Sequence, residues 1–166
     1  IQRYLPEDVA VLCLEEASER FHSRLNAKGK TYIYRIWNAD IPNVFERRFM
    51  TQIIPPLDIR LMRLAASELT GTQDYRAFCS LKRYKKSIEQ HGREIRIIAC
   101  GDGFLYHMVR ILAGTLIEVG LGNRDPRDMR RILESRNREE AGYTAPPQGL
   151  ILHSIQYEAL IFRAKA

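Results

Sequence analysis

The sequence predicts an α+β fold with a mainly antiparallel β-sheet and helices packed on one face. Segments of strand-like composition follow one another along the chain, and helical segments are inserted between them, an order typical of α+β domains. The chain has 166 residues, of which 45% are hydrophobic and 28% charged, and this is enough for one globular core. No internal repeat or low-complexity linker interrupts it, so we expect residues 1–166 to form a single domain.

Runs of β-branched and aromatic residues predict the strands. In residues 31–37, the alternation of side chains places Tyr32, Tyr34 and Ile36 on one face of a strand. The apolar run at residues 9–14 predicts a buried strand. Further strands are expected at residues 48–54, 93–100 and 150–160.

Capping signals mark two helices. Asp58 is expected to cap a helix whose apolar residues face the core. Asp125 and Pro126 indicate the start of another helix, because a capping residue is followed by a proline at the first helical position. A third helix is expected at residues 104–120. It is apolar on nearly every side, and a helix of that kind is buried.

Arg110 lies in the middle of this apolar helix. An arginine keeps its charge, and a buried charge requires a partner. The helix neighbours three and four residues away are Tyr106, His107, Ala113 and Gly114, and none of them is a carboxylate. We therefore expect an anion from another segment, another domain or a ligand to pair with Arg110. The alternative is an arginine at the helix surface with its guanidinium in water.

The net charge of +6 permits a polyanionic partner such as RNA. Basic residues gather at positions 82–86 and again, as arginines, between positions 124 and 138. Each cluster could be an RNA contact or an ordinary solvated surface, and the sequence leaves both open.

The cysteines favour a reducing compartment. Cys13, Cys79 and Cys100 are widely spaced, which argues against disulfides and zinc sites and for free thiols in the cytoplasm. We expect Cys13 and Cys100 to pack in the core. No apolar run is long enough to span a membrane.

No glycine-rich phosphate loop, nucleophile elbow or metal-spaced cluster of histidines and cysteines occurs in the sequence. Instead, short motifs follow one another in a defined order: FHSR at 21–24, KTYIY at 30–34, GTQDYRAF at 71–78, GFLYHMVR at 103–110, GTLIEVG at 114–120 and APPQGL at 145–150. In this order they resemble the C-terminal half of the tRNA pseudouridine synthase A family, and the likeness covers nearly the whole chain.

This resemblance implies an enzyme that isomerises uridine to pseudouridine in the anticodon stem-loop of tRNA, at tRNA positions 38 to 40. The family uses an aspartate nucleophile and no cofactor or metal, and it works as a homodimer. By resemblance, Arg110 pairs with that aspartate, and Tyr32 stacks on the target uracil, although Tyr32 could instead be a core aromatic. Whether the aspartate attacks the sugar or the base is left open.

Contacts with the tRNA are expected from five basic residues and one histidine: Lys82, Arg83, Lys85, Lys86, Arg24 and His107. For His107, the alternative is a structural role.

Two features depart from the family's pattern. The family's nucleophile lies in an R-T-D-x-G-V-H motif, and none of the seven aspartates of this chain follows an Arg-Thr pair. We therefore expect the chain to be the C-terminal domain, partnered by the N-terminal half of the same protein and inactive alone. The interval between Phe78 and Phe104 is also short for the family, which leaves the strand count open. The alternative interpretation is a stand-alone, non-catalytic RNA-binding or dimerisation module.

Overall fold

The computed structural model describes residues 2–69, 71–78 and 80–158, except for the side chains of residues 71–76 and 80–85. In this part of the chain, six strands form one sheet and three α-helices pack beside it. The strands are β1 (Gly29–Asn38), β2 (Thr51–Ile53), β3 (Gly71–Tyr75), β4 (Ser80–His91), β5 (Glu94–Gly101) and β6 (Leu150–Gln156). The α-helices are α1 (Ile59–Glu68), α2 (Met108–Gly120) and α3 (Asp128–Ser135).

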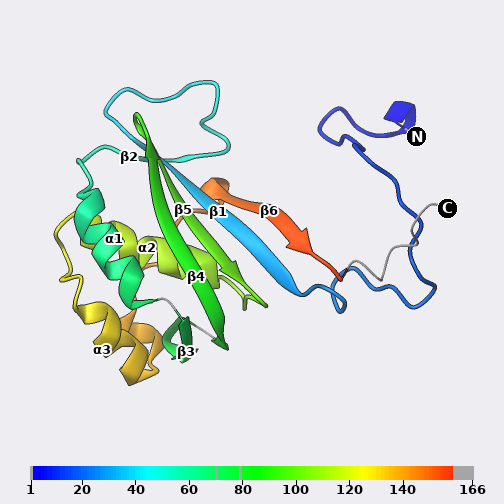
Figure 1. Ribbon diagram of the computed structural model, residues 1–166. Coiled ribbons are helices and arrows are strands. Elements are labelled where there is room, and N and C mark those ends of the chain that lie inside the picture. The colour runs from blue at the N-terminus through cyan, green and yellow to red at the C-terminus, as the bar shows by residue number, and fades with distance from the viewer. Residues whose placement is uncertain (1, 70, 79, 159–166) are drawn as a thin grey trace.

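The sheet is mixed but mainly antiparallel. Its strand order is β2-β1-β5-β4-β3, and β6 pairs with the part of β1 that β2 leaves free. The pair of β1 and β2 is parallel, whereas all other described pairs are antiparallel. Figure 1 shows the helices gathered beside the sheet, and α1 contacts β4 while α2 contacts β1. The expected α+β class is confirmed, and the parallel pair is an addition to it.

Alternation along the central strands separates a buried face from an open one. Tyr34 and Ile36 of β1 are fully buried, and their cross-strand neighbours Ile97 and Ile95 of β5 are 2% and 1% exposed. These side chains form one core with the apolar residues of α1 and α2. Eleven of the thirteen residues of α2 are buried, which confirms the expected buried helix, although it begins at Met108, four residues later than expected.

Of the two expected capping signals, only Asp58 caps its helix, because the N-cap of α3 is Arg127, which makes no side-chain capping hydrogen bond. Asp58 Oδ1 accepts hydrogen bonds from Arg60 N at 2.8 Å and Leu61 N at 3.1 Å, so Asp58 caps α1 as expected. Asp125 Oδ1 accepts a hydrogen bond from Arg127 N at 2.8 Å. This turn precedes α3, whose regular part begins at residue 128.

The strand expected at residues 9–14 is wrong. These residues form no strand and their side chains are exposed, Leu12 to 96% and Leu14 to 74%. Cys13 is likewise exposed rather than packed in the core. The N-terminal segment runs away from the sheet (Figure 1). An apolar run forms a strand only where a neighbouring strand satisfies its backbone groups, and no described strand pairs with this segment.

A hairpin of β4 and β5 occupies the interval whose strand count the sequence left open. His91 of β4 pairs with Glu94 of β5 across a turn that contains Gly92 at a φ of 62°. A positive φ of this kind suits glycine, which has no side chain to clash. Strand β4 therefore fills this interval as a full strand of twelve residues, Ser80–His91, and the basic run at residues 82–86 lies within it.

A charged cluster lies on the open face of β1 and β5. Arg35 donates hydrogen bonds to Glu94 and to Glu46, each at 2.7 Å, and Arg96 donates to Glu94 at 2.8 Å. Burial alone would raise the pKa of Glu94, but the hydrogen bonds and charges of Arg96 and Arg35 outweigh burial and lower the pKa to about 2.

We expect this cluster to make the protein sensitive to acid. The folded-state pKa of Glu94 lies below its ordinary value of 4.5. Its stabilisation is therefore complete above that value and is lost as the pH falls toward about 2. Glu94→Gln should lower the free energy of unfolding at pH 7 by about 1–3 kcal/mol and remove this part of the acid dependence. Urea unfolding at pH 7 and pH 3 measures both effects.

Glu134→Gln is the matched control, because the ion pair of Glu134 with Arg130 is exposed on both sides. This control should change the free energy of unfolding by less than about 0.5 kcal/mol. The same acid sensitivity in wild type and Glu94→Gln would show that the cluster does not carry the effect.

Candidate functional site

Arg110 lies in the first turn of α2 and is partly buried. Its Nε donates a hydrogen bond to the backbone oxygen of Ala145 at 2.6 Å, and Ala145 N donates to Arg110 O at 3.1 Å. The Nε side of the guanidinium is therefore held by the chain, while the side chain as a whole is partly exposed. Among the side chains that the structure describes, no carboxylate forms an ion pair with Arg110. No residue that the structure describes accepts a hydrogen bond from the terminal nitrogens of the guanidinium, so within these residues their donors are available to an anion from elsewhere.

The segment before Ala145 packs tightly along α2. Tyr143 N donates a hydrogen bond to Glu118 Oε1 at 3.2 Å. A Cβ atom at Gly114 would lie 1.9 Å from Tyr143 O, so this approach of two backbones requires a glycine. Arg110, Gly114 and Glu118 are spaced four residues apart and share one face of α2. One helix face thus carries both the arginine and the contacts that hold the loop orienting it.

Tyr32 lies near the start of β1, two residues before the fully buried Tyr34 and on the same face. Its side chain is partly exposed, and its ring meets the ring of Phe104 edge-on, with the centroids 5.0 Å apart. Phe104 belongs to the segment that leads into α2. The fold therefore brings Tyr32 to the segment whose continuation carries Arg110. Of the two tyrosines, Tyr34 is the enclosed core aromatic, and Tyr32 remains accessible.

A stacked aromatic pair stands directly before α2. Tyr106 is 82% exposed, and its ring stacks on that of His107 with the centroids 3.7 Å apart. His107 has a φ of 60°, a left-handed conformation that is strained for residues other than glycine and is found preferentially at functional sites. His107 also accepts a backbone hydrogen bond from Ile111 N at 2.9 Å, so it has a structural task in the first turn of α2 as well.

Arg24 lies in an exposed turn that its neighbours hold in shape. Arg24 N donates a hydrogen bond to His22 Nδ1 at 3.2 Å, and His22 N donates to Asn26 Oδ1 at 2.7 Å. The ring of Phe21 packs edge-on against Tyr157 with the centroids 5.1 Å apart, which joins the turn to the chain just after β6. The Arg24 side chain is exposed.

Lys86 differs from the exposed phosphate contact that the sequence suggested. It is 8% exposed, and its Nζ donates to Leu69 O at 2.5 Å, at the C-terminal end of α1. Burial lowers the pKa of Lys86 to about 7. The alternation of β4 turns Lys86, like Ile88, toward the buried face, and this burial speaks against the expected phosphate contact. Three other expected contacts have side chains outside the described residues: Lys82, Arg83 and Lys85.

We expect Lys86→Met in the complete protein to leave both RNA affinity and its salt dependence unchanged, because the ammonium group is enclosed. In the wild type, the pKa of Lys86 is lower in the folded state than its ordinary value of 10.5. The free energy of unfolding should therefore rise as the pH rises from about 7 toward that value, and this rise should disappear in Lys86→Met. RNA titrations at several salt concentrations and urea unfolding at pH 7 and pH 9.5 measure these effects. A flatter salt dependence in Lys86→Met would assign Lys86 to a phosphate after all.

The arginines between residues 124 and 138 are largely occupied within the chain. Arg124 Nε donates to Glu118 Oε2 at 2.9 Å, Arg131 Nη1 pairs with Glu140 Oε2 at 2.5 Å, and Arg138 Nη1 donates to Gly142 O at 3.0 Å. These bonds fix the chain between α3 and Ala145. Several arginines of this second cluster thus make contacts within the fold, a role that neither alternative included.

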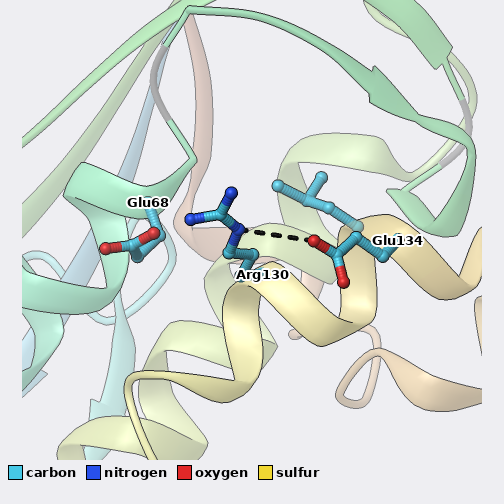
Figure 2. A pocket seen from close by; sticks show the side chains of 4 residues that line it. Glu68, Arg130 and Glu134 are labelled. Carbon is cyan, nitrogen blue, oxygen red and sulfur yellow. Dashed lines mark hydrogen bonds and ion pairs between the residues drawn. The ribbon is translucent and has the colours of Figure 1, made fainter.

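A surface pocket lies between the end of α1 and α3, with a volume of about 270 Å³ (Figure 2). It is lined by Glu68, Arg130, Leu133 and Glu134, and Arg130 pairs with Glu134 at 3.3 Å. Neither Arg110 nor Tyr32 lines this pocket. Its polar lining is an exposed ion pair, so we assign the candidate site to the neighbourhood of Arg110 and Tyr32 instead.

Membrane spans and metal sites were sought among all residues that the structure describes. No helix in it is long and apolar enough to cross a membrane. No group of three or more histidine, cysteine, aspartate or glutamate side chains within it is placed to hold a metal ion.

Comparison with known proteins shows the family of this chain. A family model described as tRNA pseudouridine synthase matches residues 65–158. The tRNA pseudouridine synthase A of Bacillus sp. (strain KSM-64) is 43% identical over 166 residues, covering 95% of this chain and 68% of the relative. The proteins of the same name from Brevibacillus brevis and Moorella thermoacetica are 39% and 41% identical, over 95% and 92% of this chain and 68% and 66% of their own lengths. The chain therefore belongs to the tRNA pseudouridine synthase family.

Proposed function

We propose that this chain is the C-terminal domain of a tRNA pseudouridine synthase that isomerises uridine to pseudouridine in the anticodon stem-loop, at tRNA positions 38 to 40. The observation that carries the proposal is Arg110. It is partly buried and oriented by Ala145 O, and no described side chain of the chain supplies its counter-ion. An arginine held in this way suits a carboxylate that arrives from outside these residues.

The chemistry of the family's reaction requires such an arginine. A carboxylate nucleophile must stay ionised in a site that excludes water, and a nearby guanidinium lowers a carboxylate pKa by about one to three units. Two parallel hydrogen bonds from the terminal nitrogens of Arg110 would also fix the direction of the carboxylate. We propose that the N-terminal part of the same protein supplies this aspartate, since the relatives extend beyond the aligned region.

A uridine within an RNA stem must leave the base stack before an enzyme can reach its glycosidic bond. The extruded base needs an aromatic wall, and the partly exposed ring of Tyr32 provides one beside the segment that leads to Arg110. The ring of Phe104, in the segment that leads into α2, packs edge-on against the ring of Tyr32 and supports it. We propose that Tyr32 stacks on the target uracil.

The remaining contacts with tRNA are proposed from exposure and charge. Arg24 is exposed on an ordered turn and suits a phosphate group. His107 and its stacking partner Tyr106 suit an unpaired base, because aromatic rings bind single-stranded bases by stacking. Lys82, Arg83 and Lys85 remain proposed phosphate contacts on β4. The net charge of +6 supports a polyanionic substrate.

We further propose a cytoplasmic homodimer that works without a cofactor. The free thiols of Cys13 and Cys100 support a reducing compartment. The dimer follows from the family alone and needs a direct measurement, such as sedimentation of the complete protein.

The experiment that tests the function uses unmodified tRNA and the complete protein, without an added metal or cofactor. We expect pseudouridine at one or more of positions 38 to 40, and none with the 166-residue chain by itself. If the complete protein binds tRNA but forms no pseudouridine, the chain belongs to a non-catalytic RNA-binding module. If the 166-residue chain is active alone, the proposal that its nucleophile lies elsewhere fails.

A further inference from the structure

The hydroxyl of Tyr34 forms a buried hydrogen-bonded chain. Tyr34 is fully buried, and its Oη lies 2.6 Å from Thr51 Oγ1 and donates to Pro146 O at 2.8 Å. A phenol has one hydrogen to donate, so the hydroxyl of Thr51 is the donor in the first contact. Thr51 of β2 is itself only 4% exposed. The chain thus runs from Thr51 through Tyr34 to the carbonyl of Pro146.

The carbonyl of Pro146 is one residue away from the group that orients Arg110. Ala145 is bonded to Arg110 on both sides, since Arg110 Nε donates to Ala145 O at 2.6 Å and Ala145 N donates to Arg110 O at 3.1 Å. A displacement of the backbone at Pro146 would therefore move the acceptor of Arg110 Nε. The direction of the guanidinium depends on how firmly this short segment is held.

The same segment docks against β1 and β2 at a second point. A Cβ atom at Gly149 would lie 2.7 Å from Arg35 O, 2.9 Å from the ring of Tyr34 and 3.0 Å from Thr51 Oγ1. No side chain fits in this space. The APPQGL motif therefore joins α2 to the sheet. Ala145 O accepts a hydrogen bond from Arg110 Nε, Pro146 O accepts one from the Tyr34 hydroxyl, and Gly149 packs against β1.

We propose that Tyr34 is a positioning residue of the active site. Its hydroxyl, backed by that of Thr51, fixes the Ala145–Pro146 carbonyls and thereby directs Arg110 toward the catalytic carboxylate. The proposal rests on the function proposed above. Tyr34 touches neither the base nor the reacting atoms, because its side chain has no exposed surface.

Electrostatics agree with this task. Burial raises the pKa of Tyr34 to about 12, and the hydrogen bond with Thr51 and the charge of Arg110 offset burial only in part. The phenol is therefore protonated near neutral pH, where it remains a hydrogen-bond donor to Pro146 O. Tyr32 and Tyr34 thus share one face of β1 but have different proposed roles. Tyr32 stacks on the target uracil, and Tyr34 holds the carbonyl of Pro146 in place.

The kinetic test uses Tyr34→Phe in the complete protein, which keeps the ring and removes only the hydroxyl. We expect the single-turnover rate at saturating tRNA to fall about 10- to 100-fold, because small displacements of catalytic groups have effects of this size. The tRNA Kd should change less than about twofold. Thr51→Val should lower the rate in the same direction, and Thr51→Ser, which keeps the hydroxyl, should restore it. An unchanged rate in Tyr34→Phe would overturn the proposal.

A double-mutant cycle separates positioning from general stability. If Tyr34 acts through Arg110, Tyr34→Phe should cause no further loss of rate in an Arg110→Lys background. Multiplied losses would show that Tyr34 acts by another route. Should Tyr34→Phe fail to fold, the single-turnover rates of Thr51→Val and Thr51→Ser in the Arg110→Lys background replace it. Equal rates would support a role through Arg110, and a further loss in Thr51→Val alone would contradict it.

A spectroscopic readout makes failure of this proposal distinguishable from failure of the proposed function. In the ¹⁵N-labelled complete protein without tRNA, the Nε–H signal of Arg110, assigned with Arg110→Lys, should be protected from hydrogen exchange. In Tyr34→Phe this exchange should accelerate at least about tenfold. Equal exchange in both proteins would overturn the positioning role whether or not the protein forms pseudouridine, and the absence of pseudouridine in wild type would overturn only the function.

Discussion

Replacing Arg110 with alanine in the complete protein should lower the single-turnover rate of pseudouridine formation about 1,000-fold. The loss follows from the proposed task, because the nucleophilic carboxylate loses both the charge that keeps it ionised and the donors that fix its direction. The tRNA Kd should change less than about threefold, since Arg110 is partly buried and bonded to Ala145 O. The rate is measured with tRNA at saturation, and the Kd in a separate titration.

Two further variants sharpen this result. Arg110→Lys should recover about tenfold of the lost rate, because lysine keeps the charge but lacks the planar pair of donors. Arg130→Ala is the control, since Arg130 is an exposed arginine paired only with Glu134 among the described ion pairs. It should leave the rate within about twofold of wild type. A full rate in Arg110→Ala, or an equal loss in Arg130→Ala, would contradict the role assigned to Arg110.

Gly114→Ala should destabilise the complete protein by about 2–4 kcal/mol and reduce its activity as well. Helix propensity alone predicts the opposite, since alanine is favoured over glycine in a helix by about 1 kcal/mol. The added Cβ would lie 1.9 Å from Tyr143 O and 2.9 Å from Tyr143 C, and a backbone cannot yield as a flexible side chain can. The loop must move outward, and Ala145 O moves with it, away from Arg110 Nε.

Gly120→Ala, at the last residue of α2, provides the comparison. There the added Cβ would meet Met62 Sδ at 2.8 Å and the end of the Leu57 side chain at 3.0 Å, and both can shift. We expect it to cost less than about half as much stability and to leave the single-turnover rate near wild type. Urea unfolding and single-turnover kinetics on both variants measure the effects. Equal losses of stability would show that the approach of the loop at Gly114 is not the cause.

The helices and the central strand were accessible from the sequence because their signals are local. Asp58 caps α1 through its own neighbours, and the alternation of Tyr34 and Ile36 in β1 needs only one covered face. The apolar stretch around Arg110 likewise predicts burial of α2, and the residues three and four positions from Arg110 include no carboxylate.

The errors arose where distant partners decide the outcome. Residues 9–14 have a strand-like composition but no neighbouring strand among the described residues. The basic run that contains Lys86 resembles a solvated surface, yet pairing with β5 makes it part of a strand with one buried face. In the same way, the arginines after residue 123 find carboxylates and carbonyls that only the folded chain brings near.

The contacts that orient Arg110 could not be foreseen in detail. The sequence carried a signal for one of them, because a glycine in the interior of an apolar helix often marks a close approach of another chain segment. That the approaching segment is Tyr143 to Ala145, and that a backbone carbonyl holds Arg110 Nε, follows only from the structure. The partner of Tyr34 at Pro146 is 112 residues away in the sequence.

The most direct measurement is an experimental structure of the complete protein. It should show the terminal nitrogens of Arg110 in two hydrogen bonds with an aspartate that precedes the residues described above, while Arg110 Nε remains bonded to Ala145 O. A guanidinium surrounded by solvent, or one paired with a carboxylate of these 166 residues, would contradict the central proposal that Arg110 orients a nucleophile from the N-terminal part of the protein.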